Sequence, residues 1–291
     1  ASFLEEVEGD NHFMITTVNS KIDACSFLTD EEKATFKAKN IEMVKGPLAE
    51  GYKIVMEELP RLKGRATNNL GLAYYYDTNG NPIGKNYYEL DFQDTVGYKI
   101  TIPDAETYIE GLLAYYEEKL PYYQNLAQNN EDFRNEVLNY QLMDHTPEEQ
   151  LAYYQEAING YFPPLTTKPK VTVKYIDKAM EDHFSPAAYM TSAIDNFTEE
   201  FIYLNNADVR DENGVFDYNY LYTTLAHEGF AGHLYQNVYF KNQDVNPLRK
   251  LLKSSGYSEG WATYAEIFSL ELLRGTYSDD FIDYLIFNEE F

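Results

Sequence analysis

The chain has 291 residues and a formal net charge of −25, from 48 acidic and 23 basic side chains. Such a surface repels phosphate backbones and anionic headgroups, so nucleic acid is excluded as an expected partner. A hydrophobic fraction of 44% excludes wholesale disorder, and the single cysteine, Cys25, excludes an intrachain disulfide.

The N-terminal part reads as helical. Thr29-Asp30-Glu31-Glu32 forms a capping box that predicts a helix running toward Lys45. Gly46-Pro47 breaks or restarts this helix, and a second helical stretch reaches Leu59-Pro60. Residues 77–85 indicate a turn.

The middle of the chain continues this pattern with one ambiguous segment. Residues 87–102 fit either a strand or a helix, and a helix is expected from about Pro103 to Lys119. Pro121 then opens or kinks the next helix. Thr146-Pro147-Glu148-Glu149 is a stronger start signal, because it combines an N-cap, a first-position proline and a box glutamate.

Two short strands are expected after a proline-rich linker at residues 162–170. Residues 171–173 and 201–204 alternate as strands do. The predicted fold is therefore mainly α with a small β-sheet. We expect an N-terminal helical region over residues 1–164 and a metal-site region over residues 165–291, or one continuous domain.

The segment Ala226-His227-Glu228-Gly229-Phe230-Ala231-Gly232-His233 carries the clearest chemical signal. Zinc hydrolases need imidazole and carboxylate ligands, with a further carboxylate to handle protons. His227 and His233 can be ligands and Glu228 the proton-handling group. However, positions six apart on an ideal helix point about 120° away from each other. The segment must bulge or break between them, and Gly229 and Gly232 would permit this.

A second acidic segment, Ser258-Glu259-Gly260-Trp261-Ala262, follows 26 residues after His233. This spacing lets the chain turn and bring Glu259 back toward the histidines from a neighbouring helix, as the third ligand of one Zn²⁺ ion. Glu266 and Thr263 lie on the same stretch and are candidates to orient a ligand. Trp261 is expected to pack beneath the site.

These two segments together resemble a bacterial family catalogued as domain of unknown function 885. The family pattern is His-Glu-Ala-x-Pro-Gly-His-His-x-Gln followed by Glu-Gly-Trp-Ala-x-Tyr-Ala-Glu. The resemblance covers about residues 165–285 well and the N-terminal helices only loosely. Three residues depart from it: Gly229 replaces Ala, Ala231 replaces Pro, and Leu234 replaces the second histidine of the pair. If that lost histidine were the true ligand, the protein would be metal-free.

The resemblance implies a zincin-like helical metallopeptidase architecture. The Glu259 segment is also similar to an element of gluzincin aminopeptidases, which implies that His227, His233 and Glu259 hold the zinc and Glu228 is the catalytic base. Family members continue past the position of Phe291. Residues that stabilise the transition state are therefore expected on a part not present here, and this chain alone could be inactive.

The predicted function is a zinc-dependent hydrolase that cleaves a peptide or small amide substrate. The strand at Tyr203-Leu204-Asn205 is expected to pair with an extended peptide, so Tyr203 and Asn205 are candidate substrate-binding residues. Two alternatives stay open: a non-catalytic helical surface or binding protein that retains a relic motif, and a zinc hydrolase of non-peptide amides or esters.

The sequence says less about the cellular location and the oligomeric state of the protein. No apolar stretch approaches the length of a membrane span, so no membrane insertion is expected. The sequence begins without Met and ends after an apolar-periodic segment, as a processed or truncated chain would. A secreted or cell-surface location is the favoured expectation, and the oligomeric state is open.

Overall fold

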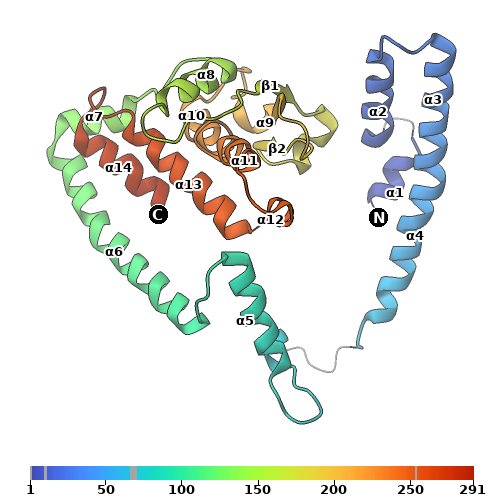
Figure 1. Cartoon of the computed structure of the whole chain (residues 1–291), viewed down its shortest axis with the longest axis horizontal. Coiled ribbons are helices and arrows are strands. Elements are labelled where there is room, and N and C mark those ends of the chain that lie inside the picture. Colours follow the sequence, from blue (N-terminus) through green and yellow to red (C-terminus); the bar gives the residue numbers. More distant parts are fainter. Residues whose placement is uncertain (1, 10–11, 66–70, 253) are drawn as a thin grey trace. The chain divides into compact units, whose positions relative to one another are not determined.

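A computed structural model describes residues 2–9, 12–65, 71–252 and 254–291. The fold is mainly helical, with one small sheet among these residues (Figure 1). The contacts divide the chain into two compact units, a smaller one of residues 1–84 and 177–183 and a larger one of residues 85–176 and 184–291. The division therefore does not fall at residues 164/165, where the sequence suggested it. The strand after the expected linker pairs within the larger unit.

The smaller unit is built from helices around a few apolar side chains. Its main elements are α1 (Ser2–Val7), α2 (Phe13–Ala24), α3 (Asp30–Met43), a π-helical turn (Val44–Leu48) and α4 (Ala49–Glu58). The capping box at Thr29 is confirmed, because Thr29 accepts from Glu32 N and the Glu32 carboxylate accepts from Thr29 N. Gly46 and Pro47 lie inside the π-helical turn that joins α3 to α4.

The larger unit holds the remaining helices. They are α5 (Ile83–Val96), α6 (Ile102–Asn129), α7 (Glu131–Asn139), α8 (Pro147–Ala157), α9 (Asn206–Val209), α10 (Tyr218–Glu228), α11 (His233–Lys241), α12 (Pro247–Leu251), α13 (Ser255–Glu271) and α14 (Asp279–Glu290). The ambiguous segment is mostly helical as α5, and α6 continues through Pro121. The capping box predicted at Thr146 is confirmed at the start of α8.

The sheet has three strands in the order β1-β3-β2: β1 (Lys170–Tyr175), β2 (Ala187–Met190) and β3 (Glu199–Leu204). β3 pairs in parallel with β1 and antiparallel with β2, with Tyr203 opposite Lys174 and Ala188. Because both sides of β3 are occupied, an extended peptide cannot pair with it. The expected strand addition at Tyr203 was wrong. Each of the outer strands, β1 and β2, has one edge that no described strand pairs with, and the sequence did not reveal β2.

Asn205 has a structural role in the interior and does not line an open groove. It is fully buried, its side-chain amide donates to Phe184 O at 3.1 Å, and its side-chain oxygen accepts from Ala207 N at 3.1 Å. These bonds cap α9 and hold the chain beside β2. Asn205 is therefore an N-cap in the interior, where the sequence suggested a substrate contact.

The core of the larger unit brings α10, α11 and α13 together, as Figure 1 shows. Two buried tyrosines connect its layers through hydrogen bonds. The Tyr154 hydroxyl donates to Tyr222 O at 2.7 Å, and the Tyr222 hydroxyl donates to Ser269 O at 2.8 Å. Each bond satisfies a hydroxyl that would otherwise be buried without a partner, so α8, α10 and α13 are fixed in position relative to one another.

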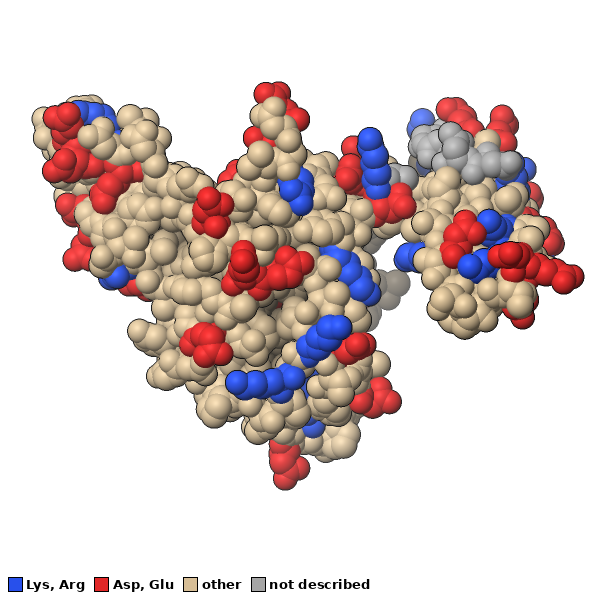
Figure 2. All heavy atoms as spheres, turned by 90° about the horizontal axis from the view of Figure 1, so that it is seen from above, with Lys and Arg blue, Asp and Glu red and all other residues tan. Residues whose placement is uncertain are grey.

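The surface reflects the acidic composition. On the face drawn in Figure 2, Asp and Glu side chains are scattered rather than gathered into one patch, with Lys and Arg side chains between them. Among the described residues, no helix has both the length and the apolar character needed to cross a bilayer.

Candidate metal centre

The histidine segment is a broken helix. α10 ends at Glu228, four residues form a buried loop, and α11 begins at His233. Ala231 in this loop has φ = 105°. Gly232 lies so close to the end of α10 that a Cβ atom would come within 1.7 Å of His227 O. The predicted break is confirmed, and the close approach explains a glycine at position 232.

Trp261 of α13 holds this loop in place. Its indole N–H donates to Ala231 O at 2.6 Å, and its ring is stacked on Tyr235 with centroids 6.0 Å apart. The hydrogen bond satisfies the carbonyl of the residue with positive φ. Trp261 therefore packs beneath the site, as its position in the motif suggested, and also fixes the break between the two helices.

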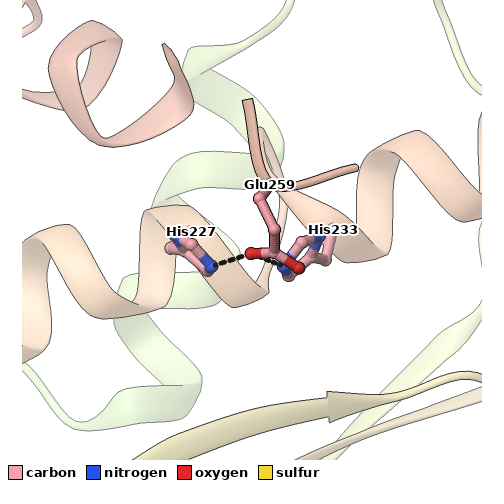
Figure 3. Close-up of side chains that lie close together, drawn as sticks. All are labelled: His227, His233 and Glu259. Carbon is pink, nitrogen blue, oxygen red and sulfur yellow. Dashed lines mark ion pairs between the residues drawn. The ribbon is translucent and has the colours of Figure 1, made fainter. Parts of the chain in front are cut away.

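The break brings the two imidazoles to one point, where α13 adds a carboxylate (Figure 3). One ligand atom from each of His227, His233 and Glu259 lies within 4.8 Å of the other two. Glu259 Oε2 is 3.5 Å from His227 Nε2 and 3.3 Å from His233 Nε2. The two rings are nearly perpendicular, with centroids 4.6 Å apart. Three side chains from three helices thus converge on a single space.

This donor set fits a zinc ion. Two atoms bound at about 2.1 Å in tetrahedral geometry lie roughly 3.4 Å apart, which is close to both nitrogen–oxygen distances. Two imidazoles and one carboxylate are also a combination found in catalytic zinc sites, where a fourth position stays open. The 61% exposure of the Glu259 side chain leaves the cluster accessible on one side.

Each histidine has a second partner at its other ring nitrogen. Glu266 contacts His227 Nδ1 through a very short hydrogen bond, and Ser258 Oγ lies 3.3 Å from His233 Nδ1. In the tautomers that donate from Nδ1, both Nε2 lone pairs face Glu259. Such partners fix the orientation of ligating imidazoles. Glu266 thus stands where the sequence placed an orienting group, whereas Thr263 is exposed on α13 and contacts none of the three converging side chains.

A carboxyl pair lies behind His227. Glu289 of α14 lies beside Glu266. Although the residue as a whole is exposed, desolvation of its carboxyl group raises its pKa to about 7, together with the hydrogen bond and charge of Glu266 and against the opposing charge of His227. Ser258 precedes Glu259 in the sequence and could have been noticed there. Glu289 lies 30 residues beyond Glu259 in a different helix, and nothing in its local sequence indicates this role.

The two imidazoles have pKa values shifted in opposite directions. Burial lowers the pKa of His233, and the charge of His227 lowers it further, although Glu228 and Glu259 oppose this. For His227 burial also disfavours the charged form, but the hydrogen bond to Glu266 and the nearby carboxylates outweigh it and raise the pKa. Without a cation between them, an additional proton that makes one of the two imidazoles positively charged therefore resides on His227.

Glu228 lies next to both histidines and faces the sheet. Its carboxylate Oε2 accepts a hydrogen bond of 2.7 Å from Tyr189 N on β2. The same carboxylate raises the pKa of both His227 and His233. Glu228 is therefore held between the converging imidazoles and the free edge of β2, without being one of the three converging groups.

The position of Leu234 shows which of the two adjacent histidines in the family pattern, at positions 233 and 234, would face this site. Its side chain is completely buried in the core cluster, whereas His233 points toward Glu259. A histidine at position 234 would therefore occupy the core and not the cluster. The departure at Leu234 does not remove a donor from the converging set.

A cavity of about 330 Å³ opens beside His233 and Glu259. Residues of α11 line it together with residues from 249–252 and 254–259 and with Tyr189 and Thr191. Its volume is at the lower end for small-ligand sites. The candidate centre thus adjoins a space large enough for part of a substrate.

Comparison with curated proteins finds no match. A solved structure of a lipoprotein candidate from Colwellia psychrerythraea is similar in fold, with a TM-score of 0.70 at 20% sequence identity. The alignment covers 96% of this chain and 48% of that one, so the chain spans about half the length of that protein. The family model described as "Bacterial protein of unknown function (DUF885)" matches residues 4–290, so it includes the N-terminal helices as well as residues 165–285. This match over nearly the whole chain establishes that the protein belongs to the bacterial DUF885 family.

Proposed function

We propose that the protein is a zinc-dependent hydrolase that cleaves peptide bonds. The observation that carries this proposal is the convergence of His227, His233 and Glu259 on one space. Glu228 lies beside that space without entering the donor set. A fold that needed only to pack its core would have no reason to gather two half-buried imidazoles and three carboxylates at this point.

The ligand side chains are held by the protein in an orientation that suits metal binding. Glu266 and Ser258 engage the Nδ1 atoms of His227 and His233, so their Nε2 atoms are the ones available as ligands. Zinc in such a site supplies Lewis acidity and lowers the pKa of a water molecule. The tyrosine hydrogen bonds between α8, α10 and α13 keep the helices that carry these ligands at a fixed separation.

Glu228 is the proton-handling group of the proposed reaction. Its carboxylate takes a proton from the attacking water and later delivers it to the nitrogen of the leaving amine. The hydrogen bond from Tyr189 N holds this carboxylate at the edge of β2. The bond directs Tyr189 N–H away from β3, and Glu228 occupies this donor.

The substrate would lie along β2. This strand has one edge paired with β3, and its other edge is next to Glu228. An extended peptide can add to a free strand edge through main-chain hydrogen bonds. The proposal thus moves the expected strand addition from β3 to the outer edge of β2, beside Glu228. A secreted or cell-surface location stays part of the proposal, since the sequence leaves it open and the similar fold comes from a lipoprotein candidate.

The first test is the zinc content of the purified protein. We expect one zinc ion per chain by elemental analysis and loss of that zinc in His227→Ala. The matched control is His183→Ala, because His183 is exposed in the smaller unit. A wild-type protein that takes up no zinc would favour the alternative of a binding protein with a relic motif.

The second test separates chemistry from metal binding. Glu228→Gln is expected to retain zinc, since Glu228 is outside the donor set, and to lose hydrolysis of a mixed peptide library followed by mass spectrometry. A panel of esters and non-peptide amides runs in parallel. Glu228-dependent cleavage confined to that panel would show the protein to be a zinc hydrolase of other substrates, and cleavage unaffected by Glu228→Gln would contradict the assigned role.

A further inference from the structure

The cavity beside the candidate metal centre is lined along one side by a single face of α11. His233, Gln236, Asn237 and Phe240 all line it. Their spacing of i, i+3, i+4 and i+7 places them on the same face of the helix. Seven residues at a rise of 1.5 Å put Phe240 roughly 10 Å along the axis from His233. The cavity therefore runs away from the candidate centre toward the end of α11.

Two cations lie at the Phe240 end of this cavity. The Arg249 guanidinium lies over the Phe240 ring, 5.3 Å from its centroid, and Lys250 Nζ donates to Lys241 O at 2.7 Å. Arg249 makes one long hydrogen bond to Leu252 O, at 3.4 Å. These contacts orient both side chains and leave most of their N–H donors unused.

Neither cation is neutralised by the protein. Within the described part of the chain, no carboxylate lies within 4.0 Å of Arg249 or Lys250. By contrast, Lys241 at the end of α11 is paired with the buried Glu200 at 2.9 Å. A pair of adjacent, unpaired cations in a cavity raises the local concentration of anions.

We propose that this cavity binds a carboxylate of the substrate, with Arg249 and Lys250 as its partners about 10 Å from the metal-binding side chains. The inference rests on the proposed hydrolase function and adds a substrate class to it: peptides with an acidic group two to three residues from the scissile bond. That separation follows because an extended peptide advances about 3.3 Å per residue. The volume of about 330 Å³ suits a short end of a peptide.

The carboxylate can come from two sources. It is either the C-terminus of the peptide or the side chain of Asp or Glu, and both present the planar pair of oxygens that a guanidinium fork and an ammonium bind. A terminal carboxylate would make the enzyme remove short C-terminal fragments, whereas a side chain would allow cleavage within longer chains.

The experiment measures binding of acetylated hexapeptides to the Glu228→Gln protein, loaded with zinc, by calorimetry. One peptide has a free C-terminus, a second series has an amidated C-terminus and a single Glu at successive positions, and the reference has Gln and an amide. We expect one of the first two classes to bind about tenfold more tightly than the reference, since each partly exposed cation contributes a few-fold. Whichever class gains identifies the source of the carboxylate.

The variants assign that gain to the cavity. In the double variant Arg249→Gln/Lys250→Gln the preference is expected to disappear, while Lys170→Gln, an exposed cation on β1, retains it. Equal binding of all peptides, or a preference unchanged in the double variant, overturns the inference. Cleavage by the wild-type enzyme without any preference for carboxylates would contradict this inference and leave the proposed hydrolase function intact. A carboxylate preference in a protein that neither holds zinc nor cleaves would instead remove the proposed function and leave the cavity assignment standing.

Discussion

Two interruptions of helices, one in each unit, look alike in sequence and differ in structure. Gly46 lies in the π-helical turn between α3 and α4, and a Cβ atom added there would meet nothing within 4 Å. Gly229 and Gly232 lie in the loop between α10 and α11. At Gly229 an added Cβ atom would come within 2.3 Å of Leu151, and at Gly232 within 1.7 Å of His227 O.

The difference shows what a glycine-marked break can do. The exposed turn keeps α3 and α4 in one continuous helical run, whereas the buried loop separates α10 from α11 and lets both imidazoles face one space. Packing from α8 and the Trp261 hydrogen bond hold the buried loop in that geometry. The proposed chemistry therefore depends on the break that the core encloses.

The largest expected effect comes from substituting the glycines themselves. Gly232→Ala should lower the free energy of unfolding by about 3 kcal/mol or more, since the new methyl group overlaps a backbone carbonyl that cannot move without opening the loop. Gly46→Ala should raise it by about 0.4–1 kcal/mol, because the site is open and alanine restricts the unfolded chain. Calorimetric thermal unfolding of both variants checks this. A Gly232→Ala protein as stable as the wild type would contradict the claimed difference between the buried loop and the exposed turn.

The second prediction concerns which face of α13 supports the buried break. Glu266→Ala should weaken zinc binding by about 10- to 100-fold, because His227 loses the group that orients its ring. Thr263→Ala, one turn earlier and exposed, should leave the affinity unchanged. Competition with a fluorescent zinc chelator measures both constants. Equal losses in the two variants would mean that the contact with His227 has no special role.

The third prediction compares the two capping boxes. Thr29→Ala and Thr146→Ala each remove the two hydrogen bonds of the threonine hydroxyl, one with the glutamate N–H and one with its carboxylate, at a local cost of about 1 kcal/mol. Amide hydrogen exchange near the start of α3 should rise about fivefold. It should rise less in α8, where Leu151 and Tyr154 are buried against the helices of the site. A larger rise in α8 than in α3 would contradict the idea that packing protects the buried break.

The smallest expected effect is a pH trend from the carboxyl pair behind His227. The pKa of Glu289 is raised from 4.5 to about 7, so the folded protein holds a proton that the unfolded chain releases, and stability falls as pH rises through this window. Glu289→Gln should therefore gain stability relative to wild type between pH 4.5 and 7. Chemical denaturation of the zinc-free proteins measures the trend. In a Glu266→Gln background part of the gain should vanish, because the partner carboxylate is gone while the burial that contributes most to the raised pKa remains.

Local signals in the sequence predicted several elements well. Both capping boxes start helices where expected, because cap hydrogen bonds are made within four residues. The strands expected at residues 171–173 and 201–204 correspond to β1 and β3. Pro121 was less informative, because α6 passes through it. The strand β2 was missed, since it is only four residues long and its alternation is weak.

Long-range features could not be read in the same way. β3 was expected at an edge of the sheet and is its central strand. Strand order depends on contacts between residues far apart in the chain, which no local pattern indicates. Glu289 was missed for the same reason. The boundary between the two units also lies elsewhere, since residues 177–183 belong with the first 84 residues despite a gap of more than ninety positions.

The sequence by itself determined the family, the mainly helical class, and the residue types at His227, Glu228, His233 and Glu259, because each is encoded locally in a motif. It also required a break in the helix, since six positions on a regular helix cannot face one point. Only the tertiary structure decided where that break points, which edge of the sheet is free, and which cations border the cavity. Those properties come from packing between helices that are distant in sequence, and no local sequence pattern specifies this packing.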